Sequence, residues 1–179
     1  MVLLLNGFFT IFQSTAADQD VLVGVSDGMN AHDPDDDAFI PNVAISYGHL
    51  IDASAAEDTV YLSRSDPLNP CEYPRRCAVG PRRVVREYSL NDGSGGVRSF
   101  SVQYRDGRYH QLGLGFLGFG QRIVTDLDTF AGTAEFYDNV TFDDALNVFP
   151  FAGQVAQQWR WTPGLPSQPK PDQIELSFL

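Results

Sequence analysis

The sequence predicts an all-β protein made of antiparallel hairpins and meanders. Apolar residues recur at every second position along much of the chain, which is the period of a strand with one buried face. Turn-forming clusters, such as Asp27-Gly28 and the segment from Asn91 to Gly96, separate these runs. No long stretch carries an apolar helical stripe with capping residues at its ends.

Short runs with strand character follow one another along the chain. The apolar opening, MVLLLNGFFTIF, favours a buried strand; a weak secretory signal is the alternative, although no basic residue precedes Asn6. We expect further strands in the segments DVLVGVS, NVAISYGHL, TVYLS, RRVVREYSL, QRIVTDLD, TAEFYDNVTF and IELSFL. Trp159 and Trp161 alternate, so they should lie on one face of another strand.

The clearest predicted unit is a hairpin centred on Asp106-Gly107. This dipeptide lies between two alternating runs, and Asp-Gly is a strong signal for a two-residue hairpin because both turn residues need a positive φ. In that register Tyr104 faces Tyr109, an aromatic cross-strand pair. Arg105 faces Arg108 at the solvent end.

Three glycines, Gly113, Gly115 and Gly118, have the G-x-G-x-x-G spacing of a dinucleotide-binding turn. Such a turn ends a strand and begins a helix whose N-terminal amides bind the pyrophosphate. The residues after Gly118 are instead β-branched and alternating, without a helix cap. We therefore expect the glycines to allow a bend or a close approach of strands, with four apolar side chains buried between layers. These side chains are Leu114, Phe116, Leu117 and Phe119.

Length and charge limit the possible functions. The 179 residues suffice for one domain with a real core or for two small β units. The formal net charge of −11 argues against a nucleic acid or an anionic membrane as partner. A basic run interrupts this acidic balance, and we expect it to pair with the acidic segment Asp33–Asp37 of the same chain. Its members are Arg75, Arg76, Arg82, Arg83 and Arg86.

Few residues could carry chemistry, and we identify no catalytic, cofactor-binding or metal-binding set. Cys71 and Cys77 are too few for a zinc site and form either a small disulfide loop or two unpaired thiols. The segment HDPDDD lacks the glycine and the glutamate that an EF-hand calcium loop requires. The run DGSGG around Ser94 has the wrong order for a serine protease. An enzyme would need a pocket that gathers His49 or His110 with a carboxylate and a nucleophile.

Several motifs in a fixed order carry a resemblance to a protein family. They comprise a tyrosine-rich hairpin, a glycine-rich GFLGF step, a Thr-Asp turn, a tyrosine and an FPF-G step. Their residues are Tyr104, Asp106, Gly107, Tyr109, Gly113, Gly115, Phe116, Gly118, Phe119, Thr125, Asp126, Tyr137, Phe149, Pro150, Phe151 and Gly153. Together with DVLVGVSDGMNA and NVAISYGHL, they make residues 20–179 similar to the Rhs-type, YD-repeat toxin proteins. More narrowly, the chain resembles the B component of bacterial insecticidal toxin complexes.

The resemblance implies a division of the chain and a function. Residues 1–19 would be an apolar N-terminal segment, 20–89 a region like the middle domain of the toxin, and 90–179 an Rhs-like hairpin region within a larger β-sheet shell or sandwich. Such proteins enclose a toxic polypeptide in a β-sheet cocoon until delivery. This chain would then be a non-catalytic shell module without a cofactor, secreted within a bacterial toxin assembly after synthesis in the cytoplasm.

The resemblance also implies the partners. They would be other toxin-complex subunits or the remainder of one large polypeptide, together with the enclosed toxin cargo. Neither nucleic acid binding nor membrane insertion is expected of this segment. Family members are many times longer, so we expect a fragment that associates through open strand edges. The alternative function is an adhesin-like β domain that binds a glycan through Trp159 and Trp161, or a cation through Asp33–Asp37.

Overall fold

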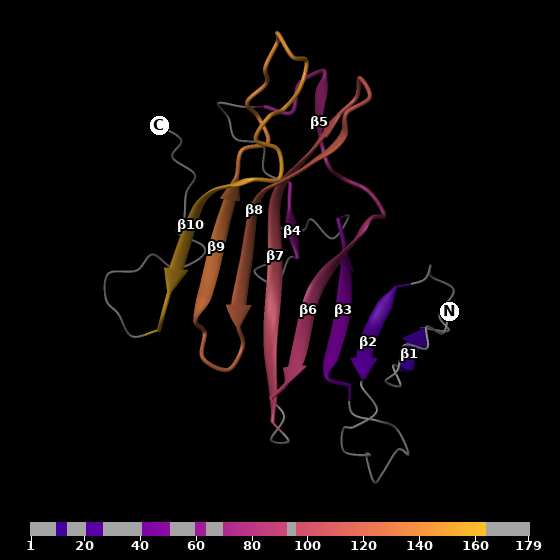
Figure 1. The fold of residues 1–179 in the computed structure, drawn as a ribbon, viewed down its shortest axis with the longest axis vertical. Helices are drawn as coiled ribbons and strands as arrows, with labels where there is room; N and C mark the ends of the chain where they lie inside the picture. The colour runs from indigo at the N-terminus through magenta and orange to yellow at the C-terminus, as the bar shows by residue number, and fades with distance from the viewer. Residues whose placement is uncertain are drawn as a thin grey trace.

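The computed structural model describes residues 10–13, 21–26, 41–50, 60–63, 70–92 and 96–163. Within these ranges the chain forms ten strands and no helix, which confirms the predicted all-β class (Figure 1). No described segment is a helix long and apolar enough to cross a membrane. The strands are β1 Thr10–Gln13, β2 Leu22–Ser26, β3 Val43–His49, β4 Tyr61–Leu62, β5 Arg75–Cys77, β6 Arg83–Asn91, β7 Val97–His110, β8 Gly115–Asp126, β9 Gly132–Tyr137 and β10 Val155–Trp161.

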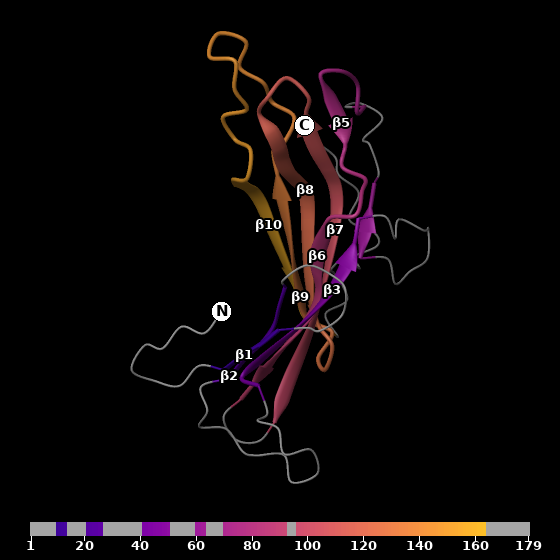
Figure 2. The same cartoon turned by 90° about the vertical axis from the view of Figure 1, so that its right-hand side faces the viewer.

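All ten strands belong to one sheet. Eight of them follow the order β1-β2-β3-β6-β7-β8-β9-β10, with every neighbouring pair antiparallel. β4 and β5 lie off this path and both pair with β7, β4 in parallel and β5 antiparallel. Figure 2 shows that the strands follow a strong twist along the long axis. Strands from both halves of the chain share the sheet, and β6 crosses the boundary expected between residues 89 and 90.

The sheet divides at β7, and we call this place the fork. β6 pairs with β7 only as far as Glu87 and Ser101. Beyond that point β4 takes over the same edge of β7 at Tyr104, and β5 follows at Arg108 to His110. Three strands in turn therefore satisfy the backbone N–H and C=O groups along one edge of β7. β6 and β3 continue together as a separate branch.

The larger apolar cluster lies at the fork, where the two branches meet. Its buried residues are Leu50, Val60, Tyr61 and Ala78, and the side chains packed against them are Val84, Tyr104, Tyr109, Phe116 and Phe119. Residues of β4, β6, β7 and β8 thus share one core with Leu50, which follows β3, and Ala78, which follows β5. A smaller cluster on β8 and β9 consists of Ile123, Ala134 and Phe136, with Trp161 of β10 packed against it.

The hairpin predicted at Asp106-Gly107 is wrong. The chain passes through both residues as β7, Tyr104 pairs with Arg122, and Tyr109 pairs with Phe116. The turn lies further on, at residues 111–114. A two-residue hairpin turn of this type needs a positive φ at both central residues. Only Asp106 has one, at 50°, so it bends a continuous strand.

The glycines of the GFLGF step make the turn and a bulge. Gly113 and Gly115 have φ values of 106° and 75° where the chain reverses into β8. Gly118, at 92°, lies where the pairing of β7 and β8 shifts register, and β8 continues as a strand to Asp126. Positive φ is costly for residues with a Cβ. The glycines therefore bend the backbone, as expected, and no helix follows Gly118.

The four apolar side chains between these glycines differ in burial. Leu117 is buried, and Phe116 and Phe119 pack against the core at the fork. Leu114 is 42% exposed in the turn, so its expected burial is wrong. Leu114 falls on the loop because the chain turns after His110 instead of at Gly107. The segments MVLLLNGFF and IELSFL lie outside the described residues.

Candidate functional site

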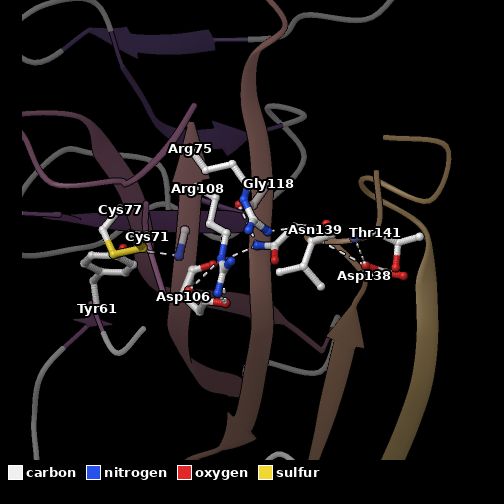
Figure 3. Close-up of polar contacts among 12 residues, drawn as sticks. Tyr61, Cys71, Arg75, Cys77, Asp106, Arg108, Gly118, Asp138, Asn139 and Thr141 are labelled. Atoms are coloured by element: carbon white, nitrogen blue, oxygen red, sulfur yellow. Dashed lines mark hydrogen bonds and ion pairs between the residues drawn. A yellow bond between two sulfur atoms is a disulfide. The ribbon is translucent and has the colours of Figure 1, made fainter. Parts of the chain in front are cut away.

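A buried polar cluster holds the bend of β7 (Figure 3). Arg108 is fully buried, and its Nε lies 3.0 and 3.1 Å from the two carboxylate oxygens of Asp106. Its Nη2 lies 3.0 Å from Asp106 Oδ2. Asp106 and Arg108 are two residues apart on one strand, so their side chains lie on the same side of it and can meet. The pair is a charge-assisted contact with no exposed surface on the arginine.

Two neighbours tie this cluster to the rest of the sheet. The buried Asn139 side chain donates to the carbonyl oxygens of Asp106, at 2.8 Å, and Gly118, at 3.4 Å. The amide of Gly107 donates to the hydroxyl of the buried Tyr61, at 3.2 Å. The cluster therefore joins β4, β7, β8 and the segment after β9. Because Asp106, Arg108 and Asn139 are buried, the cluster fits a structural role. The sequence does not reveal it, since it predicts a solvent-exposed turn at Asp106.

The FPF-G step lies against the end of β7. His110 is 5% exposed, and its ring centre lies 6.1 Å from that of Phe142 and 5.5 Å from that of Phe149. Phe151 is 48% exposed, and Gly153 has a φ of 79° in the same turn region. Among the described residues His110 Nδ1 has no hydrogen-bond partner. The described residues thus place this histidine in an aromatic environment, not beside a carboxylate and a nucleophile.

An arginine-aromatic surface covers the end of the fork, and we call it the platform (Arg76, Arg82, Tyr109 and Phe116). The guanidinium carbon of Arg76 lies 5.4 Å from the ring centre of Tyr109. That of Arg82 lies 5.3 Å from Tyr109 and 5.0 Å from Phe116. Both arginines are exposed, and both rings are partly buried. Sequence reasoning identified the arginines as a basic run but could not find the rings, because the pairing of β5 with β7 is not local.

A disulfide joins Cys71 and Cys77 and closes the loop that carries β5. Their Cα atoms are 5.3 Å apart. β5 pairs Arg76 with Tyr109 across the sheet, and the amide of Gln111 donates to the carbonyl of Pro74 at 2.8 Å. The disulfide therefore encloses the strand that presents Arg76.

Other arginines of the basic run have separate contacts. Arg75 Nη1 donates to the carbonyl oxygen of Val140 at 3.4 Å, and Arg86 lies 3.7 Å from the carboxylate of Glu87. The acidic segment expected to pair with this run, Asp33–Asp37, lies outside the described residues. The run is thus divided between structural contacts and the platform.

Trp159 and Trp161 lie on one face of β10, as predicted, but their environments differ. They pair with Ala134 and Gly132 of β9. The indole N–H of Trp161 donates to the carbonyl of Phe130 at 2.9 Å, and its ring lies so close to Gly132 that a Cβ there would be 2.1 Å away. Trp159 is 36% exposed. Trp159 is therefore the more exposed of the two, although its ring centre lies 5.9 Å from that of Phe136.

The opposite face of β8, β9 and β10 carries a polar network. One carboxylate oxygen of Glu135 accepts from Arg122 Nε and Nη2, at 2.9 and 2.6 Å, and from the hydroxyl of Tyr137, at 2.6 Å. Its other oxygen accepts from Gln158 at 3.2 Å. Burial raises the pKa of Tyr137 to about 12, helped by its bond to Glu135. The network links three strands and keeps this face of the sheet polar.

The Thr-Asp step forms a carboxylate clasp between β8 and β9. Asp126 Oδ1 accepts from the amides of Asp128 and Thr129, at 2.9 and 3.0 Å, and Arg98 Nε donates to Oδ2 at 2.6 Å. The hydrogen bond from Thr129 is the largest of the contributions that lower the pKa of Asp126 to about 2. The clasp therefore favours an ionised carboxylate in the turn.

No group of three or more histidine, cysteine or acidic side chains among the described residues could hold a metal ion. Comparison with family models, curated proteins and solved structures finds no match to this chain.

Proposed function

We propose that this chain is a non-catalytic structural module of a bacterial toxin-complex or Rhs-type protein, and that it forms part of a wall around a toxic polypeptide. Its architecture carries the proposal. All ten described strands lie in one sheet, whose larger core is confined to the fork. Stable domains usually pack two or more layers around a core. A wide sheet without a second described layer is suited to enclosing something else.

The outer edge of β10 gives further support. β10 ends the strand order, so no described strand pairs with this edge. Natural edge strands are protected by prolines, lysines or bulges that face outward. β10 reads VAQQWRW, with one arginine and neither proline nor lysine, and its residues 155–160 are exposed. Its register with β9 shifts between Val155 and Gln157, and the strand pairs regularly from Gln157 to Trp161. Such an edge is suited to a neighbouring strand of a larger sheet.

The test is the association state of the 179-residue chain, measured by size exclusion with light scattering. We expect association, because the regular part of β10 carries neither proline nor lysine and can pair with another edge. Ala156→Lys combined with Gln158→Lys should reduce it, whereas Gln111→Lys in the exposed turn should not. A sharp monomeric peak with cooperative unfolding of the unaltered chain would contradict the proposal. The coding sequence on either side should also contain propeller repeats upstream and YD repeats downstream.

An adhesin-like glycan-binding domain is the second candidate, and the exposed ring of Trp159 is the observation in its favour. Trp161 packs against Gly132 and against the apolar cluster on β8 and β9. A glycan-array signal that disappears in Trp159→Ala would support this candidate over the shell module.

A further inference from the structure

The platform holds two exposed cations. Arg76 and Arg82 contact aromatic rings, and within the described part of the chain no carboxylate lies in ion-pair range of either guanidinium. Other described arginines do form ion pairs with described carboxylates, for example Arg122 with Glu135. The guanidinium donors of the platform therefore face solvent.

Stacking prepares these two side chains for an anion. Both guanidiniums lie over the ring of Tyr109, within 5.4 Å of its centre, and Arg82 also lies over Phe116. A guanidinium that stacks on a ring keeps its in-plane N–H groups free, and its fork matches a carboxylate. Because the rings already restrict the two side chains, less conformational freedom is lost when an anion binds.

The disulfide loop holds one half of the platform in place. Arg76 lies inside the loop closed by Cys71 and Cys77, directly opposite Tyr109 in the β5–β7 pair. The amide of Ala78, just after the loop, donates to the carbonyl of Gly107 at 2.7 Å. The disulfide therefore helps to hold β5, and with it Arg76, against β7.

Exposed apolar side chains lie on the segments next to the platform. Tyr73 and Val79 flank β5 and are 72% and 57% exposed, and Leu112 in the β7–β8 turn is 63% exposed. The main chain of that turn touches the disulfide loop through Gln111 and Pro74. Charged groups beside apolar ones suit a polypeptide ligand better than a bare polyanion.

We propose that the platform is a binding site for a partner polypeptide that carries carboxylates next to apolar side chains. The carboxylates would bind the donor edges of Arg76 and Arg82, and the apolar side chains would contact Tyr73, Val79 and Leu112. The site does not depend on the shell function, because it does not use the edge of β10.

The test measures binding of a fluorescent peptide of alternating aspartate and leucine by anisotropy at low salt. Arg76→Gln with Arg82→Gln should weaken binding at least about tenfold, because two charge-assisted contacts are lost. Arg86→Gln with Arg160→Gln removes the same net charge elsewhere and should leave affinity within about twofold. Reduction of the disulfide should also weaken binding, and Arg82→Lys should fall between the unaltered chain and Arg82→Gln.

Three outcomes would overturn the proposal. The first is no binding by the unaltered chain; the second is an equal loss in the Arg86 and Arg160 control, which would indicate net charge alone. The third is equal binding of a peptide with asparagine in place of aspartate. An oligonucleotide that competes as well as the acidic peptide would show a general polyanion site and would also overturn the assignment. Association through β10 is measured with other variants, so the two proposals fail separately.

Discussion

Replacing Asp106 with asparagine removes the charge that faces a fully buried arginine. Three N–O distances of 3.0 to 3.1 Å join Asp106 and Arg108, and neither side chain has more than 9% of its surface exposed. Asparagine tolerates the positive φ of 50° at this position, so the substitution tests the ion pair and not the backbone. Removal of one partner from a buried pair costs about 3–5 kcal/mol, because the other charge stays buried after this partner is lost.

The same reasoning predicts a strong coupling between the two residues. Arg108→Met should destabilise the chain by a similar amount, since the Asp106 carboxylate then stays buried. The double variant Asp106→Asn with Arg108→Met should cost less than the sum, with a coupling energy of at least about 1 kcal/mol, because it leaves no unpaired charge.

Urea unfolding followed by the fluorescence of Trp159 and Trp161 measures these free energies. The control is Arg122→Met, whose side chain is 45% exposed and whose ion pair with Glu135 should be worth at most about 1 kcal/mol. If Asp106→Asn unfolds within about 1 kcal/mol of the unaltered chain, the ion pair does not stabilise the bend and the reasoning is refuted.

Three further predictions concern a pKa, a glycine and the disulfide. The pKa of Asp126 is lowered to about 2, first by the Thr129 amide. The ionised carboxylate therefore stabilises the fold above its ordinary pKa of 3.8, and this contribution is lost as the pH falls through about 2. The urea midpoint of Asp126→Asn should change less over this window, and a profile identical to that of the unaltered chain would refute the assignment. Gly118→Ala should cost about 1–2 kcal/mol in urea unfolding, because alanine is strained at a φ of 92°; an unchanged midpoint would show that the bulge relaxes. Reduction of the Cys71–Cys77 bond should cost about 2 kcal/mol for its short loop, whereas Cys77→Ser should not respond to reductant.

Strand positions were largely predictable because alternation is a local property of the chain. β2 and β3 lie within the segments predicted as strands, β6 ends one residue beyond its predicted segment, and the predicted QRIVTDLD covers only the second half of β8. The bending role of the glycines followed from the same local argument, since β-branched residues after Gly118 exclude a helix start there. Nothing in the partner strands is needed for these conclusions.

The Asp106-Gly107 dipeptide shows where local reasoning fails. A hairpin turn and a bend within a strand both use a positive φ at this aspartate, so the sequence does not distinguish them. The distinction comes from β4 and β5, which occupy the edge of β7 that β6 leaves and keep the strand extended through Gly107. Once the strand continues, Asp106 is buried against Arg108 and not exposed in a turn.

The sequence by itself determined the all-β class, most strand segments, the glycine bends and the shared face of Trp159 and Trp161, since each depends on neighbours within a few residues. Only the tertiary structure decided the fork, the buried ion pair of Arg108 and the platform on Tyr109. Each of these joins strands that are distant in the chain, and alternation along one strand carries no information about which strand pairs with it.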